Sequence, residues 1–341
     1  MGNMKSWFVR SATVVLLGVV LISGCSKTPT GPTPEPPPPP PPPVANPPSL
    51  TCGDGLSRAT TSATGLELHF NAPPPTDGQG SVNVTCSPNS GFTFPIGTTP
   101  VTCTATDSLN RTATCTFNVT ISRIPQISHT KFLAFGDSIT AGEVTVPLGA
   151  FFNGDGRIHK QVLVPAAAYP SVLLRTLQGR YSSQAGAFVV ANYGVAGEKA
   201  INARDRFTAA LNAVRPEVVL LIHGHNDIPG GNDGAASGAA REMEIMVQEA
   251  RLRGMRVYLS TIAPPRSTGN RPIEQRWVDD FNGRIRVIAA RQGVRLVDVY
   301  AALITDVPRY IGVDGLHPTE AGYAKIADTF FQVIQSELEV R

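Results

Sequence analysis

The sequence lacks any strong excess of charge of one sign. Its 341 residues contain 29 lysines and arginines against 26 aspartates and glutamates, a formal net charge of +3 at pH 7. Lys5 and Arg10 lie in a segment that we expect to be removed, which leaves 27 cations against 26 anions, a net charge of +1. A nearly neutral protein does not attract polyanions, so we expect no nucleic-acid partner.

The sequence also lacks, near its N-terminus, an apolar run long enough to cross a bilayer. The run from Ala12 to Ser23 has about a dozen residues, whereas a spanning helix needs about 20. Because the basic Lys5 and Arg10 precede this run, it predicts an export signal over residues 1–24.

The segment ends in Leu21-Ile22-Ser23-Gly24-Cys25, which resembles the bacterial lipobox, where small residues precede a cysteine. The resemblance implies that Cys25 receives lipid, becomes the new N-terminus and anchors the protein to a membrane of the cell envelope. The alternative is an ordinary cleaved signal peptide followed by an incidental cysteine. Whether the anchor faces the periplasm or the exterior stays open.

Cysteine is absent from the chain after residue 115. Besides Cys25, the sequence has Cys52, Cys86, Cys103 and Cys115, all in one short stretch. An even, clustered set in an exported protein favours two disulfides, and the sequence leaves all three connectivities open. A zinc site is disfavoured because no Cys-x-x-Cys spacing is present.

The composition divides the chain into a spacer and a β-rich module. Residues 25–48 are dominated by proline, which predicts an extended polyproline linker. Residues 49–122 contain short runs of alternating apolar residues, such as Leu66 to Phe70 and Cys115 to Ile121, between clusters of Gly, Pro, Asn and Asp. This period of two predicts a small β-sandwich with the cysteines on its apolar side.

One part of this module resembles a known extracellular unit. The stretch from Phe94 to Asp107, followed by Cys115-Thr-Phe-Asn-Val119, is similar to the end of a HYR (hyalin repeat) module. The resemblance implies an immunoglobulin-like β-sandwich that serves adhesion or spacing, with contact to a glycan or another surface as its expected interaction. No group of residues suited to catalysis is present in it.

From Lys131 onward, short β-branched runs alternate with stretches of helical periodicity, which predicts a parallel sheet covered by helices on both faces. The expected strands are Lys131 to Phe135, Phe188 to Tyr193, Val218 to His223, Val257 to Thr261 and Val294 to Val299. The expected helices are Tyr169 to Tyr181, Glu198 to Val214, Ala235 to Arg253, Ile273 to Arg291 and Thr319 to Leu338. We also expect a long loop beside the ligand-binding cleft from Glu143 to Ala168.

Three motifs follow predicted strands, and a fourth lies near the end of the chain. An open α/β sheet binds its ligands outside the carboxyl ends of its strands, so these positions are informative. Gly136-Asp-Ser138 follows the first strand, Gly194-Val-Ala-Gly197 the second, and His223-Gly-His-Asn226-Asp the third. Val313-Asp314-Gly-Leu-His317-Pro precedes the last helix. In this order, the four motifs resemble those of the SGNH or GDSL hydrolase family, over a domain that we place at residues 128–341.

This resemblance implies a three-layer α/β/α sandwich with five parallel strands in flavodoxin-like order, and it assigns the site residues. Ser138 is the expected nucleophile, with His317 as its base and Asp314 as the partner of His317. The backbone N–H groups of Ser138 and Gly197 and the side chain of Asn226 are the expected oxyanion donors. No cofactor and no metal are required.

The chemistry gives an independent reason for these residue types. A serine hydroxyl is a weak nucleophile near neutral pH, so it needs a base within hydrogen-bonding distance and a carboxylate that fixes the tautomer of that base. We expect Asp137 and Asp227 to support the turns in which they lie. Glu198 and His225 depart from the commoner family residues. We expect them to touch neither the three catalytic residues nor the oxyanion donors, and so to influence substrate preference.

The sequence therefore predicts an exported serine ester hydrolase that cleaves acetyl or other short acyl esters, such as those of carbohydrates or cell-envelope glycans, through an acyl-enzyme. One alternative is a lipase, lysophospholipase or acyltransferase with the same three residues. A more distant alternative is a surface-binding lipoprotein without enzymatic activity. The oligomeric state stays open.

Overall fold

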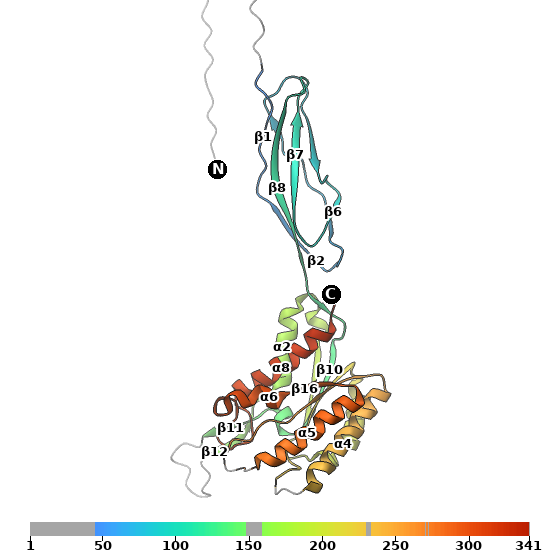
Figure 1. Cartoon of the computed structure of the whole chain (residues 1–341), viewed down its shortest axis with the longest axis vertical. Coiled ribbons are helices and arrows are strands. Elements are labelled where there is room, and N and C mark those ends of the chain that lie inside the picture. The colour runs from blue at the N-terminus through green and yellow to red at the C-terminus, as the bar shows by residue number, and fades with distance from the viewer. Residues whose placement is uncertain (1–44, 148–158, 230–232, 270, 272, 341) are drawn as a thin grey trace, which may run out of the picture. The chain divides into compact units, whose positions relative to one another are not determined.

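A computed structural model of the chain describes residues 45–147, 159–229, 233–269, 271 and 273–340 (Figure 1). The expected export signal, Cys25 and the proline-rich linker up to residue 44 lie outside this described part. Among the residues that the structure describes, no helix is both long and apolar enough to span a membrane.

The N-terminal domain consists of β-strands, as its alternating apolar residues predict. Its largest sheet has four strands in the order β2-β8-β7-β5, and β7 and β8 form a long antiparallel pair (Figure 1). Two smaller sheets are β3-β6 and β1-β4. The bounds are β1 Ser49–Leu50, β2 Leu56–Thr60, β3 Leu66–Leu68, β4 Pro75–Thr76, β5 Asn83–Ser87, β6 Phe92–Phe94, β7 Gly97–Thr106 and β8 Thr112–Arg123.

Two disulfides cross-link this domain, and the structure settles the pairing that the sequence leaves open. Cys52 is bonded to Cys115, and Cys86 to Cys103. Cys86 and Cys103 lie opposite each other across β5 and β7. Cys103 is fully buried, together with core residues such as Phe94 and Val101. The cysteines therefore cross-link strands around the apolar core, as expected.

The C-terminal domain is built on five parallel strands in the order β13-β10-β14-β15-β16. Numbered along the chain, this order is 2-1-3-4-5, the flavodoxin-like arrangement that the family resemblance implies. The strands are β10 Lys131–Gly136, β13 Val189–Gly194, β14 Val218–Ile222, β15 Arg256–Ser260 and β16 Arg295–Val297. Their positions agree with the sequence-based expectation to within a few residues.

Helices cover both faces of this sheet because alternate residues of its strands are apolar on both sides. On β10, Phe132 and Ala134 belong to the core shared with α2, α6 and α8, whereas Leu133 and Phe135 belong to the core shared with α3, α4 and α5. The bounds are α2 Tyr169–Arg180, α3 Arg204–Val214, α4 Asp233–Leu252, α5 Gln275–Gln292, α6 Val299–Leu303 and α8 Glu320–Leu338. This is the expected α/β/α sandwich.

The remaining elements are short. They are β9 Gln126–Ile127, α1 Ser138–Ala141, β11 Glu143–Pro147, β12 His159–Leu163, η1 Ser182–Ala187, η2 Ala200–Asn202, η3 Ile304–Asp306, α7 Val307–Tyr310 and β17 Glu339–Val340.

Two expectations need correction here. The expected helix from Glu198 to Val214 is divided, because the carboxylate of Asp227 accepts the N–H groups of Ala200 and Ile201 and holds a separate turn there.

The second correction concerns the segment that follows the first motif. The sequence suggests one long loop from Glu143 to Ala168, but β11 and β12 form an antiparallel pair within it. Val144 on β11 is buried, and Val146 and Val162 pack beside it, so alternating apolar residues anchor this pair to the domain core.

The two disulfides are expected to stabilise the N-terminal domain unequally, because they close chain segments of 63 and 17 residues. A disulfide restricts the unfolded chain, and this contribution grows with the logarithm of the closed length. Replacing Cys52 and Cys115 by serine should therefore cost about 1 kcal/mol more than replacing Cys86 and Cys103. Hydrogen exchange of β7 and β8 in the full chain measures both losses. Equal losses, or a larger loss for the shorter segment, would contradict this account.

Candidate active site

Ser138 lies at the start of α1, directly after the central strand β10. The side chain of Asp137 accepts the N–H of Ile139 and so caps this short helix, as the sequence suggests. Two glycines permit the close packing of strand ends around it. A Cβ added to Gly136 would lie 2.0 Å from the carbonyl oxygen of Ile222, and one added to Gly194 would lie 2.0 Å from the amide nitrogen of Ala141.

His317 and Asp314 form a buried pair in the loop before α8. Asp314 Oδ1 accepts the N–H groups of Leu316 and His317 at 3.1 and 3.0 Å, and Asp314 Oδ2 lies 2.5 Å from His317 Nδ1. Burial by itself would raise the pKa of Asp314, but the hydrogen bonds from His317 and from the backbone hold this pKa well below its usual range. The ionised carboxylate therefore accepts a hydrogen bond from the protonated Nδ1 of His317, which leaves Nε2 free to act as a base.

The structure brings Ser138 and His317 together from distant parts of the chain. His317 Nε2 lies 3.0 Å from Ser138 Oγ, and both side chains are buried. Asp314, His317 and Ser138 thus form one continuous chain of hydrogen bonds. This geometry allows the imidazole to take the proton of the serine hydroxyl.

Gly197 and Asn226 follow the two strands that flank β10. Gly197 has a φ of +74°, and no atom lies within 4 Å of the position that a Cβ would occupy. Asn226 Nδ2 donates to the carbonyl oxygen of Glu198 at 2.9 Å. This bond ties the Asn226 side chain to the residue that follows Gly197, so the two expected donors belong to neighbouring loops.

A second group of charged residues lies buried beside Ser138. Asp137 Oδ2 is 3.6 Å from His223 Nδ1 and 3.4 Å from His225 Nδ1, and all three side chains are nearly or fully inaccessible to solvent. His225 Nε2 accepts the N–H of Ala263, so the His225 ring carries its proton on Nδ1, facing Asp137. Within the described ranges, no group of three His, Cys, Asp or Glu side chains is arranged to hold a metal ion.

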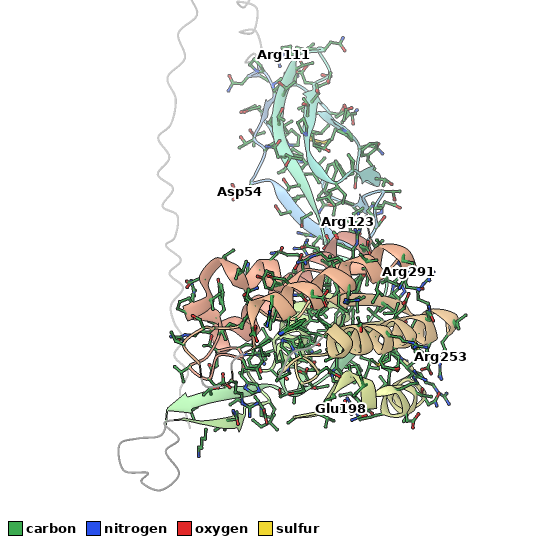
Figure 2. The ribbon with its side chains drawn as sticks, turned by 60° about the horizontal axis from the view of Figure 1, so that its bottom comes forward. Asp54, Arg111, Arg123, Glu198, Arg253 and Arg291 are labelled. Carbon is green, nitrogen blue, oxygen red and sulfur yellow. A yellow bond between two sulfur atoms is a disulfide. The ribbon has the colours of Figure 1, made fainter. Side chains whose placement is uncertain are left out.

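Glu198 extends this charged group. Its carboxylate, labelled in Figure 2, lies 3.0 Å from His223 Nε2 and accepts a hydrogen bond from Arg206. Arg206 also donates to the carbonyl oxygens of Tyr193 and Gly136, where β13 and β10 end. The expectation that Glu198 has no contact with the oxyanion donors is wrong, since its carbonyl holds Asn226. Its side chain and that of His225 are engaged inside the protein, which sequence reasoning missed.

The two carboxylates favour the charged form of His223. Burial by itself would lower the pKa of His223, but the interactions with Asp137 and Glu198 outweigh burial and raise this pKa from 6.5 to about 9. The pKa of Glu198 correspondingly falls from 4.5 to about 2, because the hydrogen bonds from His223 and Arg206 outweigh the opposing effect of burial. A neutral ring could instead accept the N–H of Gly224, which lies 2.9 Å from His223 Nδ1.

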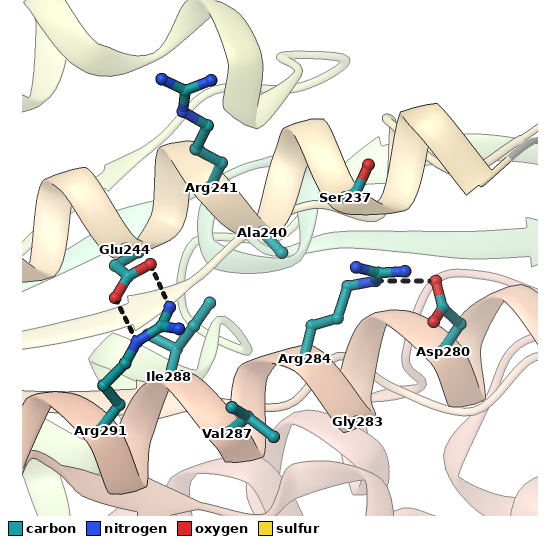
Figure 3. Close-up of a pocket in the computed structure, with 10 residues that line it drawn as sticks. All are labelled: Ser237, Ala240, Arg241, Glu244, Asp280, Gly283, Arg284, Val287, Ile288 and Arg291. Atoms are coloured by element: carbon teal, nitrogen blue, oxygen red, sulfur yellow. Dashed lines mark hydrogen bonds and ion pairs between the residues drawn. The ribbon is translucent and has the colours of Figure 1, made fainter.

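A surface groove of about 430 Å³ lies elsewhere in the domain, between α4 and α5 (Figure 3). Ion pairs of Arg284 with Asp280 and of Arg291 with Glu244 border it. Neither Ser138 nor any other expected site residue lines this groove. It is therefore distinct from the candidate active site.

Comparisons with known proteins identify a family for each of the two domains. The GDSL-like Lipase/Acylhydrolase family matches residues 134–325, more than half of the chain, and the HYR domain matches residues 45–121. The chain belongs to the GDSL-like lipase/acylhydrolase family and is a carboxylic ester hydrolase. Two disulfides and an extracellular-type HYR domain further indicate an exported protein.

Individual relatives are distant and match only part of the chain. Esterase TesA of Pseudomonas aeruginosa is 24% identical over 159 residues, which cover 47% of this chain and 76% of TesA. A GDSL lipase of Mycobacterium tuberculosis is 31% identical over 150 residues, which cover 43% of this chain and 62% of that lipase. The crystal structure of a lipase/acylhydrolase from Enterococcus faecalis covers 61% of this chain and 97% of its own, at 20% identity and a TM-score of 0.49.

The raised pKa of His223 predicts how stability depends on pH. A group whose pKa is higher in the folded state stabilises that state fully below its unfolded value, here 6.5, and this contribution is lost as the pH rises to about 9. We expect the free energy of unfolding to fall across this interval by an amount on the order of 2 kcal/mol. Urea denaturation at successive pH values measures it. The same fall in His223→Gln, which has no titrating ring at this position, would refute the assignment.

Proposed function

We propose that Ser138 is the nucleophile of this ester hydrolase, that His317 is its general base and general acid, and that Asp314 holds His317 in the required tautomer. The observation that supports this most directly is the chain of contacts, 3.0 Å from Ser138 Oγ to His317 Nε2 and 2.5 Å from His317 Nδ1 to Asp314 Oδ2. A neutral imidazole with Nδ1 protonated has its lone pair on Nε2, where the serine proton must go.

The reaction proceeds in two halves. His317 Nε2 takes the proton from Ser138 Oγ as this oxygen bonds to the ester carbonyl carbon. The tetrahedral intermediate then expels the alcohol oxygen, which receives the proton from His317, and an acyl-enzyme remains. Water, deprotonated by His317, attacks the acyl carbon, and Ser138 leaves with the returned proton. The products are a carboxylic acid and an alcohol, and no cofactor takes part.

We assign the developing oxyanion to three donors, the backbone N–H groups of Ser138 and Gly197 and the side-chain amide of Asn226. The amide of Asn226 has two hydrogens, and its bond to the Glu198 carbonyl uses one of them, so the other can bind the oxyanion. The absence of a side chain at Gly197 and the open space beside it let a substrate oxygen approach the backbone. Donors held in this way need no reorganisation during the reaction.

The substrates that we propose are acetyl or other short acyl esters, with carbohydrates or cell-envelope glycans as the alcohol part. The support is the protein's location, since an exported enzyme joined to an extracellular-type domain encounters envelope and matrix polymers. A lipase is the second candidate, because one relative is named a GDSL lipase.

We further propose that Cys25 carries the lipid anchor, that residues 25–48 act as a spacer, and that the HYR domain contacts a glycan or another surface.

Hydrolysis of p-nitrophenyl esters tests the nucleophile and the acyl preference together. Ser138→Ala should lower kcat for p-nitrophenyl acetate by about 10,000-fold or more, because the acyl-enzyme cannot form. The wild-type protein should prefer acetate and butyrate esters to palmitate. Equal rates for the wild type and Ser138→Ala would rule out the nucleophile, and a preference for palmitate would favour the lipase.

Replacing Asn226 tests the oxyanion assignment separately. Asn226→Ala should reduce kcat by about 100- to 1,000-fold with little change in KM, because the lost hydrogen bond forms chiefly in the transition state. Thermal unfolding of the variant shows whether the fold is retained. A folded variant that keeps wild-type kcat would show that Asn226 is not an oxyanion donor.

A further inference from the structure

A second carboxylate reaches the candidate base from the side opposite Asp314. Glu143, the first residue of β11, places its Oε2 atom 3.2 Å from His317 Nε2. The sequence indicates only that Glu143 lies in a loop beside the cleft. The side chain of Glu143 is 23% exposed, whereas that of His317 is fully buried. Glu143 is therefore the partly exposed member of this pair.

Main-chain contacts fix the position of this carboxylate. Glu143 lies opposite Leu163 in the β11–β12 pair, and its carbonyl oxygen accepts the hydroxyl proton of Tyr323 from α8 at 2.6 Å. The backbone of Glu143 is thus tied to elements on two sides. Among the described residues, His317 is the cationic or potentially cationic group that lies within ion-pair distance of the Glu143 carboxylate.

The surroundings of this pair carry negative charge. Burial raises the pKa of Tyr323 well above 10, and the negative charges of Asp137, Glu143 and Asp314 raise it further, so this tyrosine stays neutral. Lys160 is the cation on the neighbouring strand, where it lies opposite Val146 rather than Glu143. The buried ring of His223 contacts Asp137 and Glu198 instead.

Ser138, rather than Glu143, has hydrogen-bond geometry toward His317 Nε2 in the resting arrangement. A neutral imidazole has only a lone pair at Nε2, so it offers no proton to the Glu143 carboxylate. Once His317 takes the serine proton, Glu143 lies beside a cation and attracts it. The carboxylate thus attracts the imidazolium that forms during turnover.

The same distance constrains the leaving group. An alcohol oxygen that receives its proton from His317 Nε2 must come within about 3 Å of that nitrogen, and hence within about 6 Å of Glu143 Oε2. Groups next to the scissile oxygen therefore lie close to the Glu143 carboxylate, which is the partly exposed member of the pair. Negative charge there is repelled, whereas a positive charge or a hydroxyl hydrogen is attracted.

We propose that Glu143 is a specificity-determining residue that selects esters by the charge and hydrogen-bond donors of their alcohol part. It excludes esters with an anionic alcohol part and favours cationic or polyhydroxylated ones. This inference rests on the proposed role of Ser138 and His317, and it narrows the proposed substrates to neutral hydroxyl-rich esters, such as those of unsubstituted sugars, over esters of uronates or phospholipids.

Three aryl acetates of the same shape test the proposal with the full chain. They are 4-acetoxybenzoate, its neutral methyl ester and 4-acetoxyphenyltrimethylammonium, which place a negative, zero or positive charge on the leaving group. The readout is the ratio of kcat/KM for the cationic ester to that for the anionic ester. Glu143→Gln, which keeps the shape and removes the charge, should lower this ratio by at least about tenfold.

Glu320→Gln is the matched control, because Glu320 is an exposed carboxylate in the first turn of α8, and its removal changes the net charge equally. This control should keep the wild-type ratio.

The outcomes separate the two proposals. Activity on all three esters that survives Ser138→Ala overturns the proposed nucleophile. Activity that depends on Ser138, with the same charge ratio in the wild type and Glu143→Gln, overturns the role of Glu143 alone. Should Glu143→Gln fail to accumulate as folded protein, Glu143→Asp serves instead. Its shorter carboxylate lies farther from His317, so the ratio should fall partway, and an unchanged ratio would again overturn the proposal.

Discussion

The close approach of three parallel strands at their carboxyl ends is the constraint on which the rest of the site depends. A Cβ at Gly136 would collide with the carbonyl oxygen of Ile222 on β14, and a Cβ at Gly194 would collide with Ala141 of α1, the short helix that begins at Ser138. A side chain at Gly136 would therefore push β10 away from β14, and one at Gly194 would push α1 away from the end of β13. Because Ser138 follows one of these strands and the loops of Gly197 and Asn226 follow the others, tight backbone packing sets the positions of nucleophile and donors together.

Buried charge stabilises this arrangement from within. The carboxylates of Asp137 and Glu198 lie on two sides of the His223 ring, and each of the three residues comes from the loop after a different strand. Isolated ions of this kind would be costly to remove from water, but their mutual attraction and the hydrogen bonds of Arg206 offset much of that cost. Glu198 links this network to the proposed oxyanion donors, because its carbonyl oxygen accepts a hydrogen bond from Asn226 and its carboxylate contacts His223.

The candidate base is placed between two carboxylates with different surroundings. Asp314 is buried and accepts two backbone N–H groups in addition to the imidazole, so its geometry is fixed. Glu143 is partly exposed and reaches the other ring nitrogen, where the proton moves during the reaction. In the proposed mechanism, Asp314 holds the tautomer of His317, whereas Glu143 discriminates among the alcohol parts of the esters that approach Ser138. In this proposal, one carboxylate orients the imidazole of His317 and the other selects among ester substrates.

The sequence by itself determined the alternation of strands and helices and the positions of Ser138 and His317, because apolar periodicity and short motifs at strand ends are local signals. Its resemblance to the SGNH or GDSL family implied the strand order. Only the tertiary structure decided the pairing of the four cysteines, the inward direction of Glu198 and the contact of Glu143 with His317. These depend on which distant backbones meet and on how each loop turns its side chains. No local pattern encodes such contacts, since they arise only when the sheet, α8 and the β11–β12 pair have packed together.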